Sequence, residues 1–363
     1  MKYILFLVIF CVGFWGAISL FKPKAEVLKE KIVTPPIVGN PIQLGDPKTS
    51  IFVPYWSLSE SDSSFSSPPD INRPIDTAIY FSVSATTSGI NKTNTGYTNL
   101  GDFASRSADT PNTLLTISMV DDDINNVVLE NSAAQEKIIS QAVEIAKEHG
   151  FDGIILDLEV GGLAGKEVNT QILVFVKKAS EIIKKNNLSF AMTLYGDSFY
   201  RSRPYSIELL SPHVDQFYIM AYDMHKLWGT PGPNFPAKGA DIFGYDMQTM
   251  IRDMLKFTTR DKLTVIFGLY GHDWTVDEQK RPFTAAKTLT QSQIQKKFID
   301  SCEMKNCIIK RNPYALETEI NYIDEKAHYH IVWFEDARSV SEKIGLLKEN
   351  GINSVSYWAY SYY

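Results

Sequence analysis

The sequence predicts an α/β fold: a (β/α)8 barrel of the TIM type, with a small α+β insertion between its seventh and eighth strands. Short apolar segments typical of buried strands recur eight times after residue 50, and amphipathic helical segments separate several of them. The stretch 275–334, between the last two of these segments, is too long for a simple loop. We therefore expect one barrel over residues 49–363, with residues 275–334 forming the insertion.

The expected strands are rich in β-branched and aromatic residues and are bounded by turn-forming residues. They are 51–56, 76–83, 114–120, 152–159, 188–196, 214–223, 263–271 and 354–360. Helical periodicity predicts helices at 132–150, 171–187 and 245–257. The first of these begins with Ser132 and Gln135 in a capping-box pattern and ends at Gly150. Helix signals are weak between the first three strands, so the barrel is expected to be irregular there. No final helix is expected after the eighth strand.

Residues 1–48 precede the expected barrel. Lys2 is followed by the apolar run 4–21, which is just long enough to cross a bilayer, while small residues near its end are compatible with a cleaved signal. Residues 22–48 are rich in Lys, Pro and Glu, which predicts an extended linker. We expect segment 1–21 to be a signal anchor or a signal peptide. The barrel should then lie outside the cytoplasm, either membrane-anchored or secreted.

The composition of the chain limits the kinds of partner that it is expected to bind. The 363 residues are 44% hydrophobic, which is ordinary for a globular protein, and carry a formal net charge of -6. That charge weighs against a nucleic-acid partner. Outside the N-terminal segment the cysteines are Cys302 and Cys307. Export permits a local disulfide between them, and two free thiols are the alternative. No His lies close to them in sequence, so they predict no metal site.

Two acids interrupt the apolar segment DGIILDLE, residues 152–159. Strand alternation directs Ile154, Leu156 and Leu158 toward covering helices, and Gly153, Ile155, Asp157 and Glu159 toward the barrel interior. Both acids stand at the carboxyl end of the strand, where barrel enzymes keep their active sites. Proximity of like charges and partial burial both favour a protonated carboxyl group, which glycosidic bond cleavage requires. The alternative is a pair of acids that only hydrogen-bond to neighbouring loops.

The same segment resembles the DGxDxDxE signature of family 18 glycoside hydrolases. Asp152, Asp157 and Glu159 are in place, and Ile155 stands where the family has its middle Asp. A second family signature is matched by QFYIMAYD (216–223), and the tryptophan that floors the sugar site is matched in the eighth strand. These matches supply Met220, Tyr222, Asp223 and Trp358.

The resemblance covers about residues 50–363 and extends to a bacterial branch that includes spore-cortex and cell-wall N-acetylglucosaminidases. The segments that carry it are YDMHKLWGTPGPNFP (222–236) and HIVWFEDARSVSEKIGLLKENGINSVSYW (330–358). It implies an exported, retaining glycosidase that cleaves β-linked N-acetylglucosamine in peptidoglycan or a chitin-like glycan. The alternatives are a lectin-like barrel that binds N-acetylated glycans without cutting them, and a chitinase or endo-N-acetylglucosaminidase acting on other glycans.

The resemblance also implies a substrate-assisted mechanism, in which the 2-acetamido group of the sugar is the nucleophile. Glu159 is implied as the acid and base, Asp157 as the residue that orients the acetamido N–H, and Tyr222 as a donor to the acetamido oxygen. Because Ile155 replaces the middle Asp, Glu159 and Tyr222 must set the charge state of Asp157.

Further residues are expected to bind substrate. The resemblance implies Asp152, Met220, Asp223 and Trp358. Tyr55 and Tyr80 lie near strand ends and could line a sugar cleft, although core packing is the alternative. The expected partners are the glycan and, through the N-terminal segment, a membrane. We expect no cofactor, no metal and a monomer.

Overall fold

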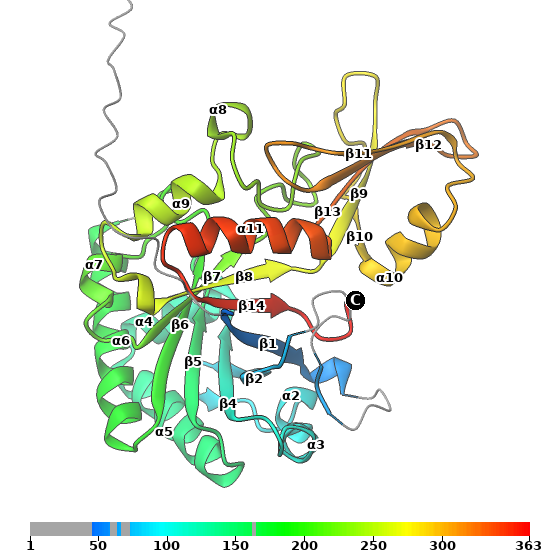
Figure 1. The fold of residues 1–363 in the computed structure, drawn as a ribbon. Coiled ribbons are helices and arrows are strands. Elements are labelled where there is room, and N and C mark those ends of the chain that lie inside the picture. Colours follow the sequence, from blue (N-terminus) through cyan, green and yellow to red (C-terminus); the bar gives the residue numbers. More distant parts are fainter. Residues whose placement is uncertain (1–45, 59–63, 67–72, 162–164) are drawn as a thin grey trace, which may run out of the picture. The chain divides into compact units, whose positions relative to one another are not determined.

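The computed structural model describes residues 46–58, 64–66, 73–161 and 165–363 (Figure 1). The expected N-terminal segment 1–21 and most of the linker 22–48 lie outside the described residues. Within the described ranges, no helix is both long enough and apolar enough to cross a membrane.

Eight parallel strands close into a barrel, because β1 pairs with β2 on one side and with β14 on the other. In order around the barrel they are β1 (Lys48–Pro54), β2 (Thr77–Thr86), β4 (Asn112–Met119), β5 (Gly153–Leu158), β6 (Ser189–Tyr195), β7 (Gln216–Ala221), β8 (Leu263–Gly268) and β14 (Ser354–Trp358). The short strand β3 (Gly89–Ile90) pairs with the end of β2. The predicted (β/α)8 architecture is confirmed, including all eight strands.

Helices follow most of the strands on the outside of the barrel (Figure 1). The longer ones are α4 (Asp122–Glu130), α5 (Ser132–Glu148), α6 (Lys166–Lys185), α9 (Met247–Met254) and α11 (Ala337–Glu349). Shorter ones are α2 (Thr95–Thr98), α3 (Leu100–Arg106), α7 (Ile207–Leu210), α8 (Ala240–Phe243) and α10 (Gln291–Ile294). Between β2 and β4 the helices are only α2 and α3, which agrees with the irregularity expected there.

The start of α5 corrects one expectation. The helix begins at Ser132, but its cap is Asn131, whose side-chain oxygen accepts from the N–H groups of Ala133 and Ala134. Gln135 does not complete a capping box, because its amide donates to the carbonyls of residues 128 and 129 at the end of α4. The expected terminator is in place: Gly150 has a φ of 74°, the left-handed conformation that follows many helix ends.

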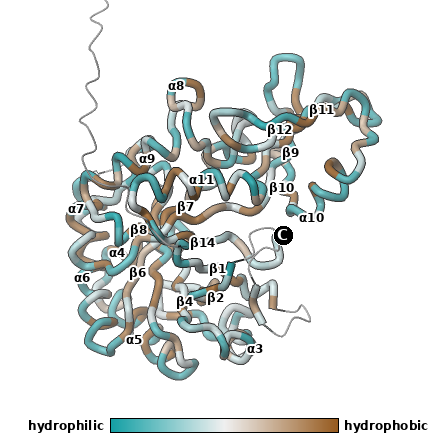
Figure 2. Tube along the Cα trace, viewed as in Figure 1, coloured by the Kyte–Doolittle hydropathy of each residue, from teal (hydrophilic) through white to brown (hydrophobic). Residues whose placement is uncertain are grey.

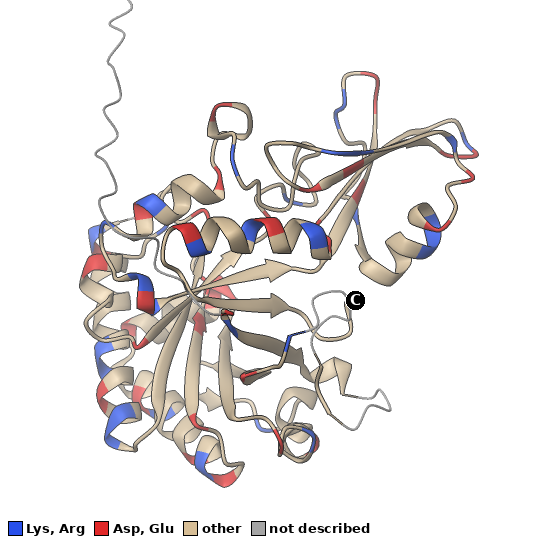
Figure 3. Ribbon diagram, in the orientation of Figure 1, with Lys and Arg blue, Asp and Glu red and all other residues tan. Residues whose placement is uncertain are grey.

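The barrel strands bury one set of side chains toward the helices and another toward the interior, as alternation predicts. On β5, Ile154, Leu156 and Leu158 belong to the large outer core. Ile155 belongs to the smaller interior cluster, which also contains Phe52, Ile79, Leu114, Ala191, Tyr218, Met220 and Ile266. Figure 2 shows that hydrophobic residues are frequent in the barrel strands and that hydrophobic and hydrophilic residues alternate along the surrounding helices. Figure 3 shows charged residues on the helices and on the insertion, while the barrel strands carry few.

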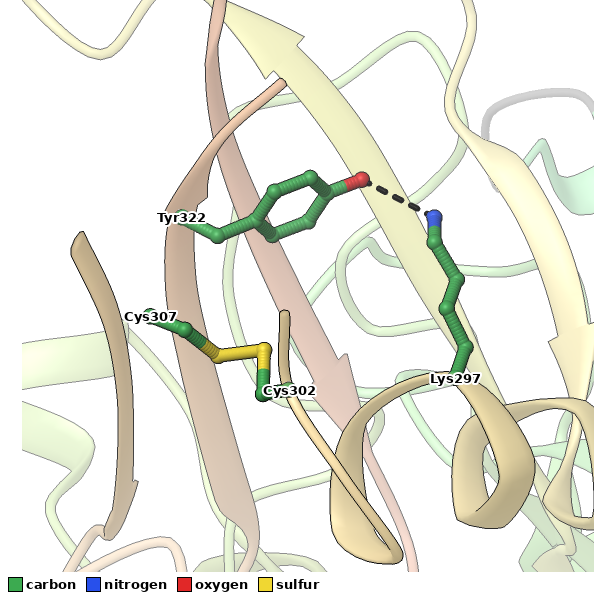
Figure 4. The surroundings of a disulfide bond; sticks show 4 residues. All are labelled: Lys297, Cys302, Cys307 and Tyr322. Atoms are coloured by element: carbon green, nitrogen blue, oxygen red, sulfur yellow. Dashed lines mark hydrogen bonds between the residues drawn. A yellow bond between two sulfur atoms is a disulfide. The ribbon is translucent and has the colours of Figure 1, made fainter. Parts of the chain in front are cut away.

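The insertion between β8 and β14 contains a five-stranded antiparallel sheet in the order β10-β9-β13-β12-β11. Its strands are β9 (Tyr270–Val276), β10 (Lys287–Thr290), β11 (Lys305–Arg311), β12 (Thr318–Ile323) and β13 (Tyr329–Phe334). Helix α10 and a π-helical turn, Gln295–Ile299, follow β10. A disulfide joins Cys302 to Cys307 on β11 and packs against the cluster that contains Tyr322 (Figure 4). The α+β character expected of the insertion is confirmed.

Candidate active site

Asp157 is the most buried acid at the carboxyl end of β5. Its side chain is 2% exposed, and its Oδ1 accepts a hydrogen bond of 2.6 Å from the Thr193 hydroxyl on β6. Its Oδ2 is buried and has no hydrogen-bond partner in the described part of the chain. Burial raises the pKa of Asp157 to about 7, and the charge of Glu159 adds to this rise while the Thr193 hydrogen bond opposes it. The carboxyl group can therefore hold a proton near neutral pH.

Glu159 lies one residue beyond β5 and is half-buried. Its backbone N–H donates to the Met119 carbonyl at 2.9 Å, and its carbonyl accepts from the Asn125 amide at 2.8 Å. The side-chain Oε2 accepts a hydrogen bond of 2.6 Å from the Tyr195 hydroxyl. Both its backbone and one carboxylate oxygen are thus held, and the side chain lines a cleft.

This cleft has a volume of about 290 Å³ and opens at the carboxyl ends of the barrel strands. Aromatic and apolar side chains form much of it, namely Phe52, Phe81, Tyr195, Met220, Tyr222, Ile266, Tyr270 and Trp358. The charged side chains that line it are Asp157, Glu159, Asp197, Asp223 and Lys226. Trp358 meets Phe81 edge-on at a centroid distance of 4.6 Å and lies nearly parallel to Tyr222 at 6.4 Å. An apolar floor beside clustered carboxylates suits a sugar, which has apolar faces and many hydroxyl groups.

Tyr222 follows the end of β7 and faces the cleft. Burial, followed by the charges of Glu159 and Asp157, raises the pKa of Tyr222 well above its ordinary value. The phenol therefore stays protonated and acts as a hydrogen-bond donor. Its hydroxyl makes no hydrogen bond to the described residues, so it is available to a ligand.

Asp223 is held by the insertion and by the loop that follows β7. Its backbone is left-handed, with a φ of 55°, and its N–H donates to the side-chain oxygen of Asn234 at 2.8 Å. Its Oδ1 accepts from the Tyr270 hydroxyl at 2.6 Å and lies 3.2 Å from His272 Nε2. Burial acts to raise the pKa of Asp223, but hydrogen bonds from His272 and Tyr270 outweigh burial and hold that pKa below its ordinary value. Asp223 is therefore a fixed negative charge at the rim.

The cleft brings together six of the residues singled out in the sequence: Asp157, Glu159, Met220, Tyr222, Asp223 and Trp358. Three others lie elsewhere. Tyr80 is fully buried between the barrel and the helices, where its hydroxyl donates to the Gly96 carbonyl at 2.7 Å. Alternation along β2 explains this, because the next residue, Phe81, takes the cleft position.

Asp152 and Tyr55 also lie outside the cleft. Asp152 precedes β5, so it stands at the opposite end of the barrel from the acids that follow it. Its exposed carboxylate accepts from the N–H of Thr113 at 2.8 Å and joins the starts of two strands. Tyr55 packs against the outer core and meets Trp56 edge-on at 4.9 Å. Neither side chain lines the cleft.

Two important cleft residues on β6 were not expected from the sequence: Thr193 and Tyr195. In the pairing of β5 with β6, Ile155 lies opposite Ala191, an offset of 36 residues. The same offset joins Asp157 to Thr193 and Glu159 to Tyr195, and each of these pairs is hydrogen-bonded. The sequence carried a weak signal: once the interior face of SFAMTLY is known, its last two interior positions are the polar residues Thr193 and Tyr195.

The described residues place no group of three or more His, Cys, Asp or Glu side chains in an arrangement that could hold a metal ion.

Several known proteins are similar to this chain in sequence, and several solved structures are similar to it in fold. The chain is 26% identical over 246 residues to the cortical fragment-lytic enzyme of Bacillus subtilis (strain 168), covering 65% of this chain and 53% of that enzyme. The enzyme of the same name from Bacillus anthracis is 26% identical over 304 residues, covering 79% of this chain and 65% of that enzyme. The chain thus spans between half and two thirds of the length of these relatives.

Solved structures share the barrel. The spore cortex-lytic enzyme SleL of Bacillus cereus superposes with a TM-score of 0.69 at 20% identity, covering 88% of this chain and 72% of that one. Human YKL-39, described as a pseudo-chitinase with retained chitooligosaccharide binding, gives 0.71 at 16% identity, covering 86% and 92%. The family model for glycosyl hydrolases family 18 matches residues 49–362. This match spans the whole barrel and its insertion, and the chain therefore belongs to glycosyl hydrolase family 18.

Proposed function

We propose that this protein is a retaining glycosidase that cleaves β-linked N-acetylglucosamine in a glycan by substrate-assisted catalysis. The observation that carries the proposal is the buried Oδ2 of Asp157, which lacks a hydrogen-bond partner beside a cleft. A buried carboxylate oxygen without a donor is unfavourable, and an acetamido N–H in the cleft would satisfy it. A sugar that carries a 2-acetamido group supplies such a donor.

The first step breaks the glycosidic bond. Glu159 gives its proton to the glycosidic oxygen, and the acetamido carbonyl oxygen attacks C1 as the leaving sugar departs. The product is an oxazolinium ion. Asp157 accepts a hydrogen bond from the acetamido N–H and stabilises the positive charge of this ion. Tyr222, a phenol with an unused hydroxyl, donates to the acetamido group and holds it below C1.

The second step restores the enzyme. Glu159, now ionised, takes a proton from water as the water attacks C1 and opens the oxazolinium ring. Two displacements at C1 retain its configuration, and the protein forms no covalent bond to the sugar. Trp358 and Met220 supply an apolar floor for the reacting ring.

Peptidoglycan is the substrate that we favour. The support is the similarity to two cortical fragment-lytic enzymes and to a spore cortex-lytic enzyme, together with the expectation that residues 1–21 export the barrel or anchor it to a membrane. A chitinase-like activity on chitin oligomers is the nearest alternative, which a choice of substrates tests directly.

Glycan binding without cleavage is the second candidate, favoured by the fold similarity to human YKL-39. The carboxylate of Glu159, hydrogen-bonded and facing the cleft, weighs against it. A barrel that only binds sugar has no need of a general acid held at this position.

The test compares the full chain with Glu159→Gln on purified peptidoglycan and on chitin oligomers, with new reducing ends identified by mass spectrometry. Loss of the general acid should lower turnover by about 10²–10⁴-fold. Glu148→Gln, an exposed position at the end of α5, is the matched control and should keep full activity. Normal turnover by a folded Glu159→Gln variant, or a covalent sugar adduct on a carboxylate, would contradict the proposal.

A further inference from the structure

We infer that Tyr195 is a positioning residue for Glu159, and that Arg203 and Asp197 hold it in that role; this inference rests on the proposed function of Glu159. The Tyr195 hydroxyl donates to Oε2 of Glu159 at 2.6 Å. The other oxygen of the carboxyl group, Oε1, makes no hydrogen bond to the described residues. The two oxygens are therefore not equivalent.

In the hydrogen bond between these two side chains, Tyr195 is the donor and Glu159 the acceptor. Burial and the adjacent charge of Glu159 raise the pKa of Tyr195 far above its ordinary value, so its phenol does not ionise. Since Oε2 already accepts a hydrogen bond from this phenol, the acidic proton of Glu159 resides on Oε1, the oxygen left open to the cleft. The same hydrogen bond strengthens as Glu159 becomes an anion, so it favours the state formed when the proton is given away.

The ring of Tyr195 is itself held from the segment that follows β6. The guanidinium of Arg203 lies 4.2 Å from the centre of the ring, in the arrangement of a cation–π contact. Asp197 lies 3.2 Å from Nε of Arg203 and 2.8 Å from a guanidinium nitrogen of Arg201. The side chains of Arg203 and Asp197 are each 7% exposed, so water screens the pair little. Asp197 forms an ion pair with Arg203. The charge of Arg203 is therefore balanced by Asp197 and not by Glu159, while its guanidinium contacts the Tyr195 ring.

A second tyrosine of the same segment fixes the backbone around Glu159. The Tyr205 hydroxyl donates to the Leu158 carbonyl at 2.7 Å and accepts from the Val160 N–H at 2.8 Å. Tyr205 thus holds the residues on either side of Glu159, while Tyr195 holds its carboxylate. One segment, 195–205, therefore sets both the position of the general acid and the oxygen that carries its proton.

The experiment uses the full chain with Tyr195→Phe, which keeps the ring under Arg203 and removes the hydroxyl. On whichever of purified peptidoglycan and chitin oligomers the wild type cleaves, kcat/KM should fall about 10- to 100-fold, the size of one hydrogen bond to a charged group, and KM should change little. The alkaline limb of the pH profile should move to higher pH, because the hydroxyl stabilises the ionised carboxylate. Tyr200→Phe, an exposed tyrosine of the same segment, is the matched control and should change neither quantity.

A second substrate separates this role from a general loss of structure. A 2,4-dinitrophenyl N-acetylglucosaminide has a leaving group that needs no proton, so Tyr195→Phe should lower its kcat/KM far less than that of the natural glycan. Equal losses on both substrates, or an unshifted pH profile, would overturn the inference. Glu159→Gln measured alongside keeps the two proposals apart: if it is inactive while Tyr195→Phe behaves as wild type, only the positioning role fails.

Discussion

The substitution Lys343→Met tests how the insertion, α11 and the loop after β7 are held together. Nζ of Lys343 donates to Glu317 Oε1, Glu335 Oε2 and the Phe235 carbonyl, each at 2.7 Å. The side chains of Lys343, Glu317 and Glu335 are all fully buried. Methionine matches the length of the lysine stem and has no charge, so it would leave two carboxyl groups facing each other without water.

Removing one member of a buried ion pair lowers stability by about 3–5 kcal/mol, because the remaining charge has neither water nor a partner. The effect should depend on pH. Burial raises the pKa of Glu335 to about 8 from an ordinary value of 4.5, against the opposing effect of Lys343. When folding raises the pKa of a group, the protonated group stabilises the folded protein fully at any pH below the pKa of the unfolded chain. This stabilisation is lost as the pH rises through the pKa of the folded protein. Lys343 lowers the pKa of Glu335, so its removal raises the folded pKa of Glu335 further. The deficit of Lys343→Met is therefore expected to be larger at pH 8, where the wild-type carboxyl group begins to ionise beside Lys343, than at pH 5, where it is protonated in both proteins.

Urea unfolding followed by tryptophan fluorescence at pH 5 and pH 8 measures both deficits. Lys348→Met is the control, since it makes the same change on the same helix at a side chain that is 31% exposed. It should alter the free energy of unfolding by less than about 0.5 kcal/mol. A deficit for Lys343→Met below about 1 kcal/mol at pH 8, or one that is equal at both pH values, would refute the reasoning.

Four further results are expected. Asp157→Asn should lower kcat by about 10²–10³-fold with a smaller change in KM, because the charge it stabilises develops along the reaction path; steady-state kinetics that show only a raised KM would contradict this. The same variant should be more stable than wild type at pH 8, by about 1–3 kcal/mol in urea unfolding, since burial raises the pKa of Asp157 to about 7 and the folded protein loses stability as the pH rises through that value. Replacing Cys302 and Cys307 by Ser should lower stability by about 2 kcal/mol, the loop-closure effect for a bridge between cysteines five positions apart, and should leave activity intact; a thermal scan with and without reductant gives the comparison. A chain that starts near residue 45 should be soluble and as active per molecule as the full chain, because residues 43–363 form one compact unit; aggregation or inactivity would show that the boundary is misplaced.

The sequence by itself determined what depends on local periodicity and on short motifs. Alternation along 152–159 separates Ile154 from Ile155 and directs Asp157 into the barrel, since successive side chains of a strand point to opposite faces. The family signatures pointed to Tyr222 and Trp358, and the structure gathers both of these around one cleft. Spacing along one strand is enough for such inferences, because a strand has only two faces.

Tertiary structure alone decided which residues of different strands meet. The partner of Glu159 is Tyr195, 36 positions away, and the pairing register of β5 with β6 brings them together. Tyr80 was expected at the cleft but takes the helix-facing side of β2, and Asp152 stands at the wrong end of its strand. Lys343 is buried together with its ion-pair partners, Glu317 of the insertion and Glu335 at the junction of the insertion with α11. Contacts of this kind require barrel closure and inter-strand register, which arise from the packing of the whole chain and leave no mark at any single position of the sequence.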